Sequence, residues 1–175
     1  MTRIAYLVPL ALFAFIAGLG GYLLTQPKDE AIPSQMVAKP LPEFDLPPAG
    51  QGLVGVSDDD FVGGQPKLLN LWASWCLPCI AEAPHLASLE QQGAEIIGIA
   101  IRDKPEDVAQ FLAEHGNPYT QIGADNISGI QFELGSSGLP ETYVIDAKGV
   151  IRHQHIGDIR AEHVPLLLER LEAAK

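Results

Sequence analysis

Two cysteines, Cys76 and Cys79, are the only cysteines of this chain, and just two residues separate them. A structural disulfide stabilises a protein mainly by removing loop entropy from the unfolded chain, and this gain grows with the closed loop. A ring of about 4 residues is worth roughly 1.9 kcal/mol, against about 4.7 kcal/mol for a loop of about 100 residues. The spacing therefore favours a redox role for the pair over a structural one.

The expected helix after this pair begins around Cys76. Backbone N–H groups and the helix dipole at a helix N-terminus favour a thiolate, so Cys76 is expected to be the exposed nucleophile. Cys79 follows within the first turn and is the expected resolving cysteine. A C-x-x-C pair could instead bind a metal, but a zinc site usually takes four ligands and this chain has no third cysteine. Neither a metal site nor a cofactor is predicted.

The segment from Gly138 to Thr142 reads Gly-Leu-Pro-Glu-Thr and stands just before an expected hairpin. A proline that enters a strand here is a candidate for a cis peptide bond, with a trans proline in a simple loop as the alternative. Such a loop presents free backbone groups beside the thiols, where an extended substrate can pair as an added strand. Pro140 is therefore assigned to the catalytic site, and Leu139, Glu141 and Thr142 to substrate binding.

Glu82 lies three residues after Cys79, and therefore on the same face of the expected helix. A partly buried carboxylate has a raised pKa and could take up the proton of Cys79; a solvent-facing glutamate is the alternative. Asn70, six residues before Cys76, could also face the pair, but a neutral amide cannot take a proton. Trp75 provides apolar cover for the sulfurs and is expected to contact the substrate.

The elements that position these residues follow from the apolar pattern of the chain. Near-continuous apolar runs are typical of strands covered on both faces, and apolar stripes ended by glycine or proline are typical of helices. The expected strands are residues 67–72, 95–101, 142–145 and 150–155. The expected helices are residues 76–93, a second helix that begins at Asp103 or Lys104 and ends at Gly116, and residues 165–172. This order predicts an α/β fold with a central mixed sheet flanked by helices.

An uncharged run from residue 4 to residue 24 precedes the first acidic residue, Asp29. A helix of this length would be about 31 Å long, close to the roughly 30 Å hydrocarbon core of a bilayer. Arg3 and the terminal amine favour a cytoplasmic N-terminus. A cleaved signal peptide is the alternative, but no clean small-x-small cleavage site precedes Pro27 and the apolar run is long for a signal peptide, which favours an uncleaved anchor. Either interpretation sends the rest of the chain across the membrane.

The chain is therefore predicted to contain a transmembrane anchor in residues 1–24, a linker in 25–41 and one folded domain in 42–175. Three prolines stiffen the linker, which shows no apolar periodicity. With 175 residues, of which 47% are hydrophobic, the chain has enough apolar material for one domain with a core. Its net charge of −11 argues against a nucleic-acid partner, which would require a basic face.

Several motifs together resemble the membrane-anchored thioredoxin-like reductases, in particular the CcmG (DsbE) family of cytochrome c maturation. The first is Asn70-x-Trp72-x-x-Trp75-Cys76-x-x-Cys79, and the second is Gly138-x-Pro140-Glu141-Thr142. Further support comes from Gly116-Asn117-Pro118-Tyr119, Ile145-Asp146-x-x-Gly149-x-Ile151 and Gly157-Asp158. The resemblance covers residues 42–175 and the anchor, and it implies a thioredoxin-like fold.

The resemblance also implies roles for individual residues. Cys76 would attack the substrate disulfide and Cys79 would resolve the mixed disulfide, with Pro140 as the cis-proline. Glu82 would be the acidic residue near the active site. Glu141 matches the acidic residue that follows the cis-proline.

Two stretches depart from the family pattern. Ser136-Ser137 stands where the family often has Val-Tyr, and Ile101-Arg102-Asp103 where it often has Tyr-Lys-Asp. Both departures are expected to touch the substrate groove.

The expected protein is a thiol:disulfide oxidoreductase held in the bacterial inner membrane by residues 4–24, single-pass, with its C-terminal domain in the periplasm. Its expected client is oxidised apocytochrome c, whose C-x-x-C-H disulfide must be reduced before haem attaches. The periplasm is kept oxidising, so a DsbD/CcdA-type membrane thiol reductase is the expected electron donor. The alternatives are a TlpA- or ResA-like reductase for another client, such as copper-site assembly, and a metallochaperone that uses the two cysteines and a histidine.

Overall fold

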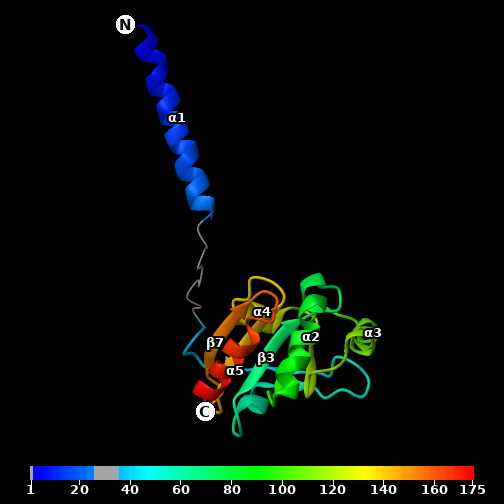
Figure 1. Ribbon diagram of the computed structural model, residues 1–175. Coiled ribbons are helices and arrows are strands. Elements are labelled where there is room, and N and C mark those ends of the chain that lie inside the picture. The colour runs from blue at the N-terminus through cyan, green and yellow to red at the C-terminus, as the bar shows by residue number, and fades with distance from the viewer. Residues whose placement is uncertain (1, 26–35) are drawn as a thin grey trace. The chain divides into compact units, whose positions relative to one another are not determined.

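A computed structural model describes residues 2–25 and 36–175, and the chain divides into two compact units, Met1–Pro33 and Ser34–Lys175 (Figure 1). The first unit contains one helix, α1 (Thr2–Thr25), with Pro9 inside it. No helix in the described part of the chain is long and apolar enough to cross a membrane. Residue 1 of the predicted anchor and residues 26–35 of the predicted linker lie outside the described residues.

The second unit is built on a five-stranded sheet with the order β5-β4-β3-β6-β7. The central strand β3 (Lys67–Trp72) is parallel to β4 (Ile96–Ile101), and β4 is parallel to β5 (Gln121–Asp125). On its other side β3 is antiparallel to β6 (Glu141–Ile145), and β6 is antiparallel to β7 (Ile151–Ile156). The sheet is therefore mixed, as predicted.

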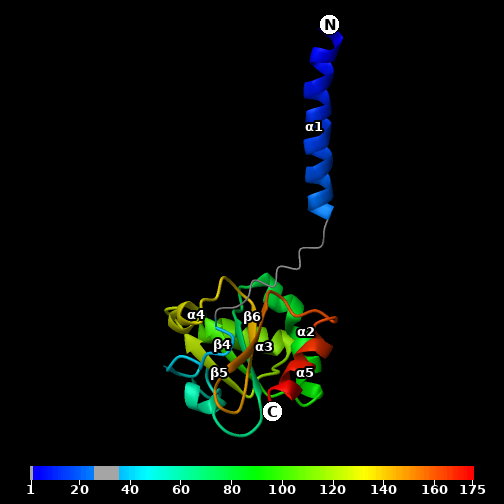
Figure 2. The same ribbon diagram turned by 90° about the vertical axis from the view of Figure 1, so that its left-hand side faces the viewer.

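Helices cover both faces of this sheet (Figure 1, Figure 2). One face packs against α2 (Leu77–Gln91), α3 (Pro105–His115) and α5 (Val164–Ala173). The other packs against α4 (Gly129–Glu133) and the 3-10 helix η1 (Asp58–Phe61). Figure 2 shows α4 on one side of the sheet and both α2 and α5 on the other. This layering confirms the predicted thioredoxin-like α/β architecture.

Alternation along β3 decides which side chains reach the site. Successive side chains of a strand point to opposite faces, and all of β3 after Lys67 is buried. Leu68 and Trp72 join the core beneath α2, whereas Leu69 and Leu71 join the opposite core. Asn70 shares the parity of Leu68 and Trp72, so its amide faces α2.

Sequence patterning missed the shortest elements. The strands β1 (Asp45–Leu46) and β2 (Val56–Ser57) form a separate antiparallel pair, and β5 and α4 were also unforeseen. Each of these elements has five residues or fewer, and in β5 and α4 glycine and polar residues interrupt the apolar run.

The folded unit begins before the predicted domain start at residue 42. The N–H groups of Ala38 and Leu41 donate to the carbonyls of Ile151 and Gly149, both at 2.8 Å. Edge strands leave such backbone groups open for pairing, and β7 lies at the edge of the sheet. The last residues of the predicted 25–41 linker therefore belong to the folded unit.

Replacing Gly98 of β4 by alanine is expected to lower the free energy of unfolding by about 1–3 kcal/mol, because the added methyl overpacks the core. An added Cβ would lie 2.9 Å from both Trp72 Nε1 and Tyr119 Cδ1. Gly129→Ala is the matched control, since its nearest neighbour would lie 3.8 Å away. Urea denaturation of both variants measures the difference, and an equal cost would contradict this packing.

Candidate active site

Cys76 and Cys79 are joined by a disulfide at the start of α2. Cys76 is the N-cap residue of the helix, and the Cys79 N–H donates to Cys76 Sγ at 3.2 Å. Both cysteines are buried, with 5% and 2% of their surface exposed, so the expected exposure of Cys76 is wrong for the disulfide form. After reduction, an N–H directed at Cys76 Sγ favours a thiolate on that sulfur. The structure thus confirms the predicted position of the pair at a helix N-terminus.

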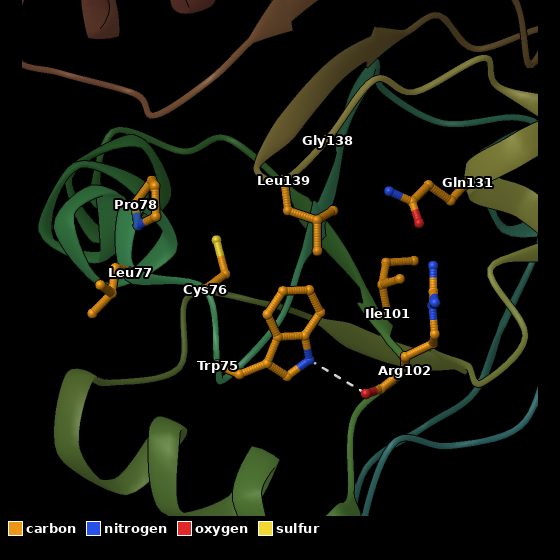
Figure 3. A pocket seen from close by; sticks show the side chains of 9 residues that line it. All are labelled: Trp75, Cys76, Leu77, Pro78, Ile101, Arg102, Gln131, Gly138 and Leu139. Atoms are coloured by element: carbon orange, nitrogen blue, oxygen red, sulfur yellow. Dashed lines mark hydrogen bonds between the residues drawn. The ribbon is translucent and has the colours of Figure 1, made fainter.

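An apolar pocket of about 450 Å³ opens beside Cys76 (Figure 3). Four segments line it: Trp75, Leu77 and Pro78 at the start of α2, Ile101 and Arg102 at the end of β4, Gln131 of α4, and Gly138 and Leu139 before β6. Trp75 and Leu77 are 61% and 77% exposed, unusual values for large apolar side chains. An apolar surface of this kind beside a reactive sulfur suits the docking of a client segment.

Backbone contacts hold Trp75 at the edge of this pocket. The indole Nε1 donates to the Arg102 carbonyl at 3.3 Å, and Arg102 has a positive φ of 47°. The neighbouring Ser74 donates its N–H and hydroxyl to the Asp103 carboxylate at 2.5 and 2.7 Å. The stretch 101–103, expected to touch the groove, therefore both lines the pocket and supports its wall.

The loop before β6 contains the predicted cis peptide bond, between Leu139 and Pro140. From this loop, Gly138 and Leu139 line the pocket, and the Leu139 side chain points into it (Figure 3). Pro140 is buried, and its carbonyl accepts from the Gly157 N–H at 3.0 Å.

Glu141 and Thr142, both assigned to substrate binding by the sequence, do not reach this pocket. Glu141 is 1% exposed and accepts from the Ser137 N–H and hydroxyl, both at 3.1 Å. It also accepts from the Tyr143 hydroxyl at 2.6 Å and from Gln154 Nε2 at 3.1 Å. These four donors occupy the Glu141 carboxylate, which holds Ser137 in place. Thr142 is buried too, and its hydroxyl accepts from Asn70.

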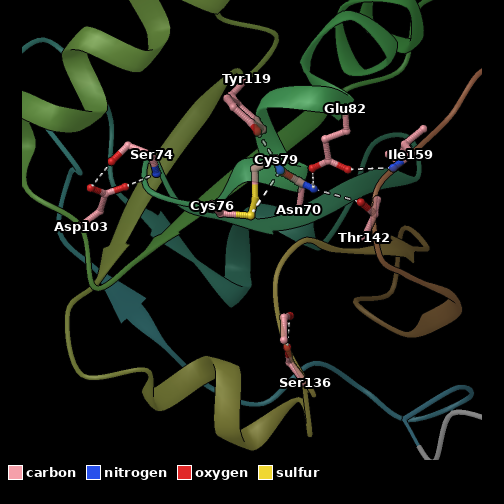
Figure 4. The surroundings of a disulfide bond; sticks show 11 residues. Asn70, Ser74, Cys76, Cys79, Glu82, Asp103, Tyr119, Ser136, Thr142 and Ile159 are labelled. Atoms are coloured by element: carbon pink, nitrogen blue, oxygen red, sulfur yellow. Dashed lines mark hydrogen bonds between the residues drawn. A yellow bond between two sulfur atoms is a disulfide. The ribbon is translucent and has the colours of Figure 1, made fainter.

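The Glu82 carboxylate lies on the inner side of the site and is fully buried (Figure 4). Oε1 accepts from Asn70 Nδ2 at 3.1 Å, and Oε2 accepts from the Ile159 N–H at 3.0 Å. Cys79 and Glu82 both belong to the buried face of α2. The predicted buried position of Glu82 is therefore confirmed, and the solvent-facing alternative is wrong.

Burial raises the pKa of Glu82 from its ordinary 4.5 to about 7, because the charged form loses its water. The two N–H donors act in the opposite direction and lower this pKa, whereas the negative charge of Asp158 raises it further. A carboxyl with a pKa near 7 can accept or release a proton at neutral pH.

Some contributors to the site were not identified from the sequence. Gln131 lines the pocket from α4, and Ile159 binds Glu82 from the loop before α5. Tyr119 donates its hydroxyl to Asn70 Oδ1 at 2.8 Å; it ends the Gly-Asn-Pro-Tyr stretch, which carried only a resemblance. Among the described residues, no group of three or more His, Cys, Asp or Glu side chains is arranged to hold a metal ion.

Comparison with known proteins gives concordant matches. Residues 37–154 match the AhpC/TSA family. The thiol:disulfide interchange protein HelX of Rhodobacter capsulatus is 35% identical over 99% of this chain and 98% of its own length. DsbE of Pseudomonas fluorescens is 40% identical over 91% of this chain and 88% of its own.

A solved structure extends the similarity to the fold. A Chlorobium tepidum protein described as a thiol:disulfide interchange protein DsbE superposes with a TM-score of 0.64 and 27% identity. The match covers 79% of this chain and 96% of that protein. With its paired cysteines at the start of α2, this chain is a thiol:disulfide oxidoreductase that belongs to the AhpC/TSA family and, within it, to the CcmG/DsbE group.

Proposed function

We propose that this protein reduces the disulfide in the C-x-x-C-H motif of apocytochrome c before haem attachment. The observation that carries the proposal is the two-sided environment of the Cys76–Cys79 disulfide. An apolar pocket lies beside Cys76, and a buried carboxylate lies on the inner face of the helix that bears Cys79. The CcmG/DsbE resemblance of the sequence supports cytochrome c maturation as the setting.

The reaction begins with the reduced protein. The Cys76 thiolate attacks one sulfur of the client disulfide, that S–S bond breaks, and the released client sulfur takes up a proton. Cys79 then loses its proton and attacks Cys76 Sγ, so that the mixed disulfide breaks; the second client sulfur takes up a proton from solvent, and the client leaves as a dithiol. The client gains two electrons, and the protein is oxidised to the Cys76–Cys79 disulfide, the form in which the structure describes it.

Glu82 acts as the proton acceptor for Cys79 in this second step. A thiol must lose its proton before it can attack, and the buried Cys79 needs an internal base. With a pKa of about 7, Glu82 is about half ionised at neutral pH and can take the proton. Trp75 and Leu139 contact the client at the pocket, with Pro140 in the loop beside them.

The protein works in the periplasm, anchored to the bacterial inner membrane through the uncharged residues 4–24. Each client reduction leaves the protein oxidised, and an oxidising compartment does not regenerate the dithiol. A DsbD/CcdA-type membrane thiol reductase supplies the electrons for the next cycle, and the anchor keeps the domain near that donor.

A trapping experiment tests the client and the roles of the cysteines. Reduced Cys79→Ser protein, mixed with an oxidised peptide that carries C-x-x-C-H, is expected to accumulate a mixed disulfide through Cys76, because the resolving thiol is absent. Mass spectrometry detects the adduct, and Cys76→Ser is the matched control, which should form none. The proposed client would be rejected if no adduct forms, or if a peptide with the same cysteines but a scrambled motif reacts equally fast.

The raised pKa of Glu82 predicts how the stability of the oxidised protein depends on pH. Between pH 4.5 and about 7 the folded protein holds a proton that the unfolded chain has released. The free energy of unfolding should therefore fall by about 3 kcal/mol as the pH rises through this window.

Glu82→Gln should remove this fall, which urea denaturation between pH 4 and pH 8 would show. Glu90→Gln, on the exposed face of the same helix, is the matched control and should retain the wild-type dependence. Identical pH dependence in Glu82→Gln and the wild type would mean that Glu82 does not titrate in this window.

A further inference from the structure

Tyr119 reaches the site from the segment before β5, far from α2 in the sequence. Its ring is buried and stacks on Trp72, with ring centroids 5.3 Å apart and planes 12° from parallel. Gly98 makes room for this ring, because an added Cβ there would lie 2.9 Å from Tyr119 Cδ1. The stacking on Trp72 and the space left by Gly98 thus define the position of the ring, whose hydroxyl meets Asn70.

The Asn70 amide connects Tyr119 to Glu82 (Figure 4). Its Oδ1 accepts from the Tyr119 hydroxyl at 2.8 Å. Its Nδ2 donates to Glu82 Oε1 at 3.1 Å and to Thr142 Oγ1 at 3.0 Å. An asparagine amide has one accepting and one donating end, so these three partners together define its orientation.

The opposite orientation of this amide would change the charge preference of Glu82. A half-turn would place Asn70 Oδ1 against Glu82 Oε1, so that two acceptors would face each other. Such an arrangement disfavours the carboxylate and favours the protonated carboxyl. The hydroxyl that binds Oδ1 therefore acts on Glu82 without touching it.

We propose that Tyr119 is a positioning residue that holds the donor end of the Asn70 amide toward Glu82 and so keeps Glu82 able to accept the Cys79 proton. This inference rests on the proton-accepting role proposed for Glu82. The Tyr119 hydroxyl is well placed for it, because burial raises the pKa of this phenol well above its ordinary value. It therefore remains a neutral donor throughout the range in which Glu82 titrates.

The other groups that face Glu82 come from every neighbouring element. The loop before α5 contributes the charge of Asp158 and the N–H of Ile159, and β6 contributes the neutral Thr142 through Asn70. The α2 helix itself contributes Cys79, which does not titrate in the disulfide form. Measurement on the oxidised protein therefore reports Glu82 without interference from the thiol.

Tyr119→Phe in the oxidised full chain is the test. Because the hydrogen bond to Asn70 is lost, the titration midpoint of Glu82, followed by carboxyl NMR, should rise by about one pH unit. Tyr143→Phe is the matched control, since it removes another buried phenol hydroxyl, one bound to Glu141. That variant should leave the Glu82 midpoint unchanged, although both variants lose stability.

A kinetic readout separates positioning from packing. In Tyr119→Phe the pH profile for resolution of the mixed disulfide by Cys79 should shift to higher pH by the same amount as the Glu82 midpoint. The double variant Glu82→Gln/Tyr119→Phe should have the same pH profile as Glu82→Gln alone. A shift of equal size without Glu82 would show that Tyr119 acts by packing.

A second variant covers the case in which Tyr119→Phe does not fold. Site-specific 3-fluorotyrosine at position 119 keeps the ring and strengthens the O–H donor, so the Glu82 midpoint should fall. An unchanged midpoint in the folded variants would overturn the proposal. The NMR titration requires no client, so its outcome is independent of the trapping experiment on apocytochrome c peptides.

Discussion

The burial of the Glu82 carboxylate is the constraint on which the rest of the site depends. Removing a carboxylate from water is costly unless N–H donors replace the water, and here two donors do so. One is the amide of Asn70 on β3, and the other is the N–H of Ile159 before α5. Because each donor must reach its own oxygen, β3, α2 and the loop before α5 are held in one arrangement.

This arrangement divides the site into two functional sides. Outside the disulfide, loops that include Arg102 and Leu139 form an apolar surface next to Cys76. Inside, a chain of polar contacts from Tyr119 through Asn70 ends at Glu82. Changes in these loops can therefore alter the apolar surface while the contacts of Glu82 stay intact. The two family departures, Ser136-Ser137 and Ile101-Arg102-Asp103, both fall on or beside the outer side.

The same division explains where sequence reasoning succeeded and where it was wrong. Apolar runs located β3 and β4, while β5 and α4 were too short and too polar to recognise. Glu141 was assigned to the groove because it follows Pro140 in the chain. Strand alternation places it instead on the face of Tyr143, where both side chains are buried. Proximity along a chain does not say toward which face a side chain points.

Local spacing was sufficient to identify the reactive cysteine pair and the helix that begins at Cys76. It also identified Glu82, because residues three positions apart lie on the same face of a helix. Local spacing could not predict contacts between residues that are far apart in the chain. Tyr119 and Asn70 are 49 positions apart, and Ile159 and Glu82 are 77 apart. Such pairs meet only after the sheet has ordered its strands and the helices have packed on it. The identity of the reactive sulfurs is thus a local property of the chain, and the protonation of Glu82 is a property of the folded whole.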